Sequence, residues 1–77
     1  MILRIEYIKN QIDEIEKRIR AYKEDLQKLE RAFNESRDSK TRLNLYRILQ
    51  ALKEEIEGAR ALLAIYRKDL EGEKWTY

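Results

Sequence analysis

The sequence has no cysteine, no histidine and no proline, and each absence narrows the kind of protein it can encode. Without cysteine there can be no disulfide, and without histidine the chain lacks the commonest metal ligand and the usual general base at neutral pH. No apolar run approaches the roughly 20 residues of a membrane span, and MILRIEYIKN at residues 1–10 lacks the apolar core of a secretion signal. We therefore expect a cytoplasmic protein with no membrane contact and no cofactor.

What the chain has in abundance is charge. Asp, Glu, Lys and Arg make up 42% of its 77 residues, a composition typical of long solvent-exposed helices. A chain of this length forms one domain, near the lower limit for building a core without a disulfide, a metal or a partner. Abundant Lys, Glu, Ile and Tyr without Cys or His also fit a heat-adapted source. The net charge of +2 is too small to indicate nucleic-acid binding by itself.

Apolar residues recur at alternating spacings of four and three in both halves of the chain, which is the pattern of a coiled-coil seam. The first seam consists of Met1, Ile5, Ile8, Ile12, Ile15, Ile19, Tyr22, Leu26, Leu29 and Phe33. The second seam has a different phase and consists of Leu45, Leu49, Leu52, Ile56, Ala59, Leu63, Tyr66 and Leu70. Because the phase changes, one straight helix would expose its apolar stripe on two different faces.

The segment between the seams has the residues of a turn. Asn34 tolerates the left-handed conformation that ends helices, and Ser36, Asp38 and Ser39 are good N-cap residues. Folding the chain about residue 39 aligns eight seam layers, apolar to apolar, in pairs whose residue numbers sum to 78. We predict a single all-α domain, an antiparallel two-helix coiled-coil hairpin; a continuous long helix is the alternative. The predicted ranges are a first helix over 2–34, a turn over 35–40, a second helix over 41–71 that Gly72 ends, and a tail over 72–77.

A second apolar stripe lies beside the seam of the predicted second helix, and the first helix has no comparable stripe. It is interrupted by Glu55 and consists of Ile48, Ala51, Gly58, Leu62 and Ile65. Small residues allow another helix to approach closely, and a glycine in the middle of a helix costs about 1 kcal/mol relative to alanine. We predict that the stripe is the interface of a homodimer that forms a four-helix bundle. The alternative is a slightly apolar surface on a monomer.

The sequence offers little for catalysis. It has no glycine-rich phosphate loop, no Ser/His/Asp set and no Cys nucleophile, and its carboxylates have the spacing of a solvated helix face. Residues 8–19, IKNQIDEIEKRI, resemble the opening helix of the all-helical chorismate mutases, but Lys9 stands where that family carries a substrate-binding arginine. We predict neither enzymatic activity nor a metal site.

Two local features suggest contacts with other molecules. Residues 31–47 carry five basic and two acidic side chains, so the turn has a local charge of +3, and Arg37, Lys40 and Arg42 are candidate phosphate contacts. Near the C-terminus, Trp75 and Tyr77 either fold back over the open end of the hairpin or anchor a partner.

These features favour a non-enzymatic protein–protein interaction module, such as a small adaptor, inhibitor or regulator, built on a self-associating helical hairpin. Its expected partners are a second copy of itself and a protein that the sequence does not identify. The alternative is a small nucleic-acid-binding dimer that uses the basic turn.

Overall fold

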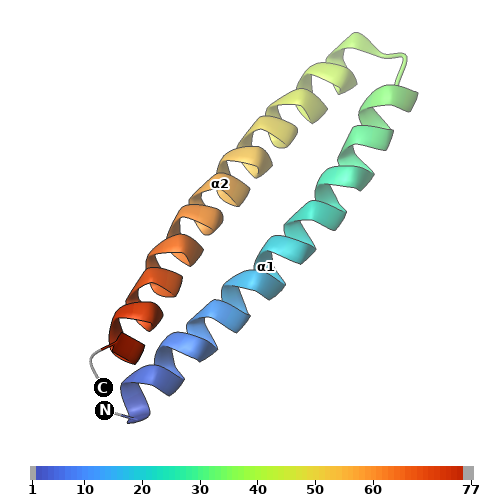
Figure 1. The fold of residues 1–77 in the computed structure, drawn as a ribbon. Helices are drawn as coiled ribbons and strands as arrows, with labels where there is room; N and C mark the ends of the chain where they lie inside the picture. Colours follow the sequence, from blue (N-terminus) through green and yellow to red (C-terminus); the bar gives the residue numbers. More distant parts are fainter. Residues whose placement is uncertain (1, 76–77) are drawn as a thin grey trace.

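The chain folds into two long helices packed antiparallel, as a computed structural model of residues 2–75 shows (Figure 1). Helix α1 spans Ile2–Glu35 and helix α2 spans Ser39–Trp75, with side chains described for residues 4–72. The rod measures 59 × 14 × 13 Å between its outermost Cα atoms, and the start of α1 and the end of α2 lie at the same end of it. The predicted antiparallel hairpin is confirmed. Neither helix, over the described residues, has an apolar stretch long enough to cross a bilayer.

The core lies between the two helices and is built from the seams that the heptad spacing predicts. The side chains that are less than 9% exposed are Ile8, Ile15, Ile19, Leu49, Ile56, Ala59 and Leu63. The remaining seam residues from Ile5 to Leu70 are half-buried. Ile15, Ile19, Ala59 and Leu63 form one cluster against which Ile12 and Tyr66 pack. These six residues make up three of the predicted layers, so the structure has the predicted register in this part of the hairpin.

The turn is shorter than predicted, because α2 begins earlier. Residues 36–38 connect the helices, and Asp38 caps α2: its Oδ2 atom accepts hydrogen bonds from the backbone N–H of Thr41 at 3.0 Å and from the Thr41 hydroxyl at 2.7 Å. These hydrogen bonds hold the pKa of the Asp38 carboxyl below its ordinary value. Asn34 does not take the left-handed conformation, since no non-glycine residue in the described chain has a positive φ.

The Arg42 side chain contacts residues on both sides of the turn. Its guanidinium lies 4.4 Å from the centre of the Phe33 ring and donates a hydrogen bond of 3.2 Å to the Ser36 carbonyl oxygen. The side chain of Arg42 therefore bridges the end of α1 and the first turn of α2, and it is half-buried there.

Helix α2 extends further than predicted. It continues through Gly72 to Trp75 instead of ending at residue 71. A glycine ends a helix by taking a positive φ, and none of the described glycines does so. The part of the predicted tail over 72–75 is thus helical.

Candidate interaction surface

The exposed side of α2 carries the five residues predicted as a dimer interface, which we call the α2 stripe: Ile48, Ala51, Gly58, Leu62 and Ile65. Its three large side chains are 50%, 40% and 57% exposed at Ile48, Leu62 and Ile65. Ala51 and Gly58 are exposed as well. The structure therefore places the stripe beside the core of the hairpin and leaves it uncovered by α1.

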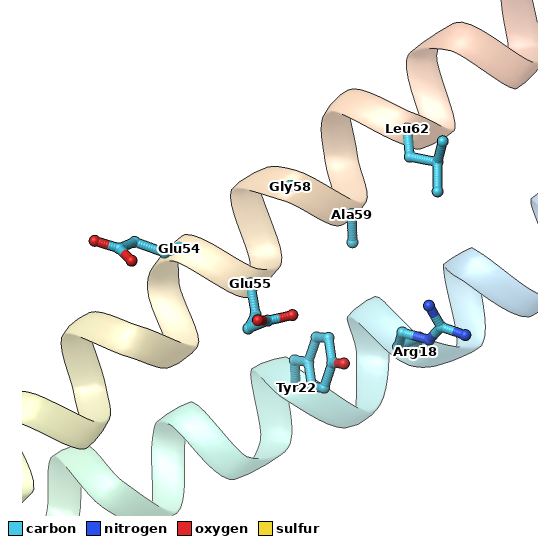
Figure 2. Close-up of a pocket in the computed structure, with 7 residues that line it drawn as sticks. All are labelled: Arg18, Tyr22, Glu54, Glu55, Gly58, Ala59 and Leu62. Atoms are coloured by element: carbon cyan, nitrogen blue, oxygen red, sulfur yellow. The ribbon is translucent and has the colours of Figure 1, made fainter.

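Two shallow hollows lie where the stripe side of α2 meets α1. The first, which we call the Gly58 hollow, has a volume of about 310 Å³ and is lined by Arg18, Tyr22, Glu54, Glu55, Gly58, Ala59 and Leu62 (Figure 2). The second, the Ala51 hollow, has a volume of about 530 Å³ and is lined by Asp25, Lys28, Leu29, Ile48, Ala51, Leu52 and Glu55. Glu55 lines both, so its carboxylate stands between two openings on one face of the rod.

The hairpin itself does not require the glycine at position 58. A Cβ atom built there would meet no atom within 4 Å, and the residue takes no positive φ. Figure 2 shows Gly58 between Glu55, which reaches over Tyr22, and Leu62, which is directed towards α1. The cost of a mid-helix glycine, about 1 kcal/mol, is therefore not offset inside the chain.

Helix α1 contributes charged side chains to the same face. Arg18 lines the Gly58 hollow, and Asp25 and Lys28 line the Ala51 hollow. With Glu14 and Ala21 they follow one another at spacings of four and three, so they share one side of α1, and all five are exposed. We call the four charged residues, Glu14, Arg18, Asp25 and Lys28, the α1 charge row. Sequence reasoning passed over this row, although its heptad spacing is visible in the sequence.

The ion pairs between described residues do not include the α1 charge row, although the charge of Glu14 acts on Lys17. In the described part of the chain these pairs are Asp13 with Lys17 at 3.0 Å and Glu16 of α1 with Arg67 of α2 at 3.7 Å. The Asp13 carboxylate raises the pKa of the Lys17 ammonium through a hydrogen bond and its charge. Both pairs are solvent-exposed, and the charges of the row are in neither of them. Among the described residues no cluster of three or more carboxylates could hold a metal ion.

The other predicted contact residues divide into two groups. Arg37 and Lys40 are exposed at the turn, whereas Arg42 is held by Phe33 and Ser36. The candidate anchor at Trp75 and Tyr77 lies outside the side chains that the structure describes.

Comparison with known proteins gives no relative: no protein-family model matches the sequence, and no curated protein or solved structure matches it significantly.

Proposed function

We propose that the chain is a non-enzymatic protein–protein interaction module that associates with itself through the α2 stripe and forms a four-helix bundle. The observation that carries this proposal is the exposure of three large aliphatic side chains in one row, on a helix whose other apolar face already forms the hairpin core. Scattered exposed apolar residues are ordinary on protein surfaces, but these three lie with Ala51 and Gly58 in one stripe that only Glu55 interrupts, and aligned apolar surface is typical of interaction sites.

The size of the stripe fits a modest dimer. Because about half of Ile48, Leu62 and Ile65 is already covered by the hairpin, burying the remainder contributes about 1 kcal/mol per side chain, or about 6 kcal/mol in a symmetric dimer. A dissociation constant of 1 μM corresponds to about 8 kcal/mol, and association itself has an entropic cost. One long face of the rod, 59 × 14 Å, covers about 800 Å², the area that each partner buries in an interface of standard size. The three side chains alone are therefore not sufficient for a micromolar dimer, and its affinity depends on further contacts along this face.

The role that this arrangement favours is that of a small adaptor, inhibitor or regulator. A dimer of hairpins presents two copies of every outer surface on a rigid rod, and paired surfaces bind a protein partner more tightly than single ones. The identity of that partner is a separate question from self-association.

The test is a double substitution in the stripe, Leu62→Glu with Ile65→Lys, which leaves the hairpin seam and the net charge unchanged. It places two charges on each side of the interface and removes about 4 kcal/mol of apolar burial from the dimer. We expect the dissociation constant to rise about a thousandfold, so that analytical ultracentrifugation shows a helical monomer at concentrations where the wild type is dimeric.

The same helix offers a matched control. Leu43 and Tyr46 are 50% and 51% exposed, have the same three-residue spacing and lie outside the stripe. Leu43→Glu with Tyr46→Lys therefore introduces the same charges at the same exposure, and we expect it to sediment as a dimer. A wild-type monomer, or equal behaviour of the two variants, contradicts the proposal.

The nucleic-acid alternative has its own measurement. It is tested by the fluorescence anisotropy of mixed RNA or DNA fragments at low salt, and we expect the wild type not to bind them. Salt-sensitive binding that disappears in Arg37→Gln with Lys40→Gln would instead make the basic turn the functional site. Arg42 is left in place in this variant because it stabilises the turn.

A further inference from the structure

We infer that two copies of the hairpin pair antiparallel, about a two-fold axis at the layer of Tyr22 and Ile56, and that each Glu55 enters the Gly58 hollow of the other copy beside Arg18. This inference rests on the proposed self-association and specifies its geometry. It is carried by two sets of residues, the α2 stripe and the α1 charge row, which define the same axis independently.

The α2 stripe is self-complementary when its direction is reversed. If residues whose numbers sum to 113 face each other, Ile48 meets Ile65 of the second copy, Ala51 meets Leu62, and Glu55 meets Gly58. Leu62 then lies against a small residue, and the long Glu55 side chain faces a residue without a side chain. The centre of this pairing lies between residues 56 and 57. Helix α2 runs from Ser39 to Trp75, so this centre is also close to the middle of the helix.

The α1 charge row is self-complementary in the same sense. When α1 of the second copy runs in the opposite direction and is centred on Ala21, Glu14 comes level with Lys28 of that copy and Arg18 with Asp25. The numbers of these pairs sum to 42 and 43, which puts the centre at residues 21 and 22. In the hairpin, facing seam residues have numbers that sum to 78, so this centre on α1 lies at the same height as residues 56 and 57 on α2. One two-fold axis satisfies both helices.

A parallel pair would place the apolar stripe against charges. Its two-fold axis runs along the rod and brings α2 of each copy opposite α1 of the other, so Leu62 would face the α1 charge row near Arg18 and Ile48 would face it near Lys28. Charges across an interface chiefly fix which orientation forms and contribute less to its affinity. Only the antiparallel pair places the α2 stripe on itself and the α1 charge row on itself with opposite charges level. Arg47 lies within one helical turn of Lys68 of the second copy, but both are exposed at the rim, where a pair of charges has little effect.

This geometry also accounts for the two residues that do not fit a simple apolar stripe. Glu55 interrupts the stripe, and Gly58 weakens the helix without any need inside the hairpin. In the antiparallel pair, the stem of Glu55 crosses Gly58 of the second copy, and its carboxylate reaches the hollow that Arg18 of that copy lines together with Glu54 and Glu55. Arg18 then lies between the Glu55 and the Asp25 that line the Ala51 hollow of the opposite chain. Each copy thus places its Glu55 side chain in the Gly58 hollow of the other.

Spin labels at two positions distinguish this geometry from the alternatives. Glu57 and Glu71 share one exposed side of α2, away from the stripe, and the chain has no cysteine of its own, so Glu57→Cys and Glu71→Cys are matched sites for a single label per chain. In the antiparallel dimer the two copies of position 57 lie at nearly the same height, whereas those of position 71 are separated by about 45 Å along the rod. Double electron–electron resonance should give about 30 Å or less for Glu57→Cys and about 50 Å for Glu71→Cys.

The outcomes separate this inference from the proposed function. Equal short distances at both positions would show a parallel dimer, which overturns the geometry and leaves self-association intact. Absence of any distance between chains, in samples where the wild type sediments as a monomer, would overturn both.

Charge exchange gives a second test that does not depend on labels. Glu14→Lys and Lys28→Glu are made in separate chains, and the two positions lie about 21 Å apart along α1, too far to interact within one chain. In the antiparallel dimer of either variant alone, positions 14 and 28 carry the same charge and meet in two places. We therefore expect its dissociation constant to rise by about threefold or more. An equimolar mixture restores both opposite pairs and should return to the wild-type constant. If each variant alone and the mixture all dimerise like the wild type, Glu14 does not face Lys28 of the second copy and the antiparallel geometry is wrong.

Discussion

At the scale of single residues, the beginning of α2 depends on one carboxylate. Asp38 accepts two hydrogen bonds from Thr41, and they lower its pKa below the ordinary 3.8 because they stabilise the charged form. A group whose pKa is lowered by folding contributes stability above its unfolded pKa, and this stability is lost as the pH falls through the folded pKa. The cap is therefore fully effective at neutral pH and weakens below about pH 4.

This titration predicts a pH-dependent effect of removing the cap. Asp38→Ala should lower the Tm at pH 7, and the difference from the wild type should narrow between pH 4 and pH 2. Thermal unfolding followed by circular dichroism measures it. In the control Asp38→Asn, the amide oxygen still accepts hydrogen bonds but does not titrate, so its Tm should exceed that of Asp38→Ala by the same amount at pH 7 and pH 2. A difference between wild type and Asp38→Ala that does not change with pH would show that the charge of Asp38 has no part in the cap.

Glu55 and Gly58 show what a sequence can and cannot reveal about a site. Both stand out in the sequence, one as a gap in an apolar stripe and the other as a weak helix former. The spatial relation between them is not visible in the sequence, because it depends on the hollow that α1 forms beside them and on the Arg18 side chain that lines it. The charge row was missed for a similar reason: charges at helical spacing fit a solvated surface equally well, until their place beside the stripe is known.

At the scale of the helices, a regular period makes the core predictable. Eight layers repeat one pattern, so an error at one position does not change the register, and the buried residues from Ile8 to Leu63 all belong to the predicted seams. The helix ends were less predictable, because each end depends on local hydrogen bonds and φ values. The Asp38 cap starts α2 at Ser39, and Gly72 keeps a helical conformation instead of ending the helix.

Burial along the seam predicts where the hairpin is most sensitive to loss of apolar volume. Ile15 is 2% exposed, whereas Leu29, in a layer nearer the turn, is half-buried. Ile15→Ala should lower the free energy of unfolding by about 3 kcal/mol, and Leu29→Ala by less, because a half-buried site leaves a smaller cavity. Urea denaturation of both variants at one protein concentration gives the comparison. Equal losses would mean that Leu29 is more deeply covered in the dimer than in the hairpin alone.

At the scale of the whole molecule, the antiparallel pairing would give a rod with a basic turn at each end. Residues 31–47 carry the local charge of +3, and reversing one hairpin against the other places these segments about as far apart as the 59 Å length of the rod allows. Any partner that contacts both turns must therefore span the full length of the dimer.

The connection of only three residues between the helices predicts the order in which the hairpin folds. Layers near the turn join residues close in the chain, such as Phe33 and Leu45, while the last layer joins Ile8 and Leu70, so the entropy lost on closing each layer is smallest at the turn. Folding should start at Asp38 and close towards the open end. In the Leu62→Glu with Ile65→Lys background, where association does not enter, stopped-flow measurements should show that Leu45→Ala slows folding. Leu70→Ala, at a site that is also half-buried, should mainly speed unfolding. The reverse assignment would place the nucleus at the open end, and the turn would then be the last part of the molecule to form.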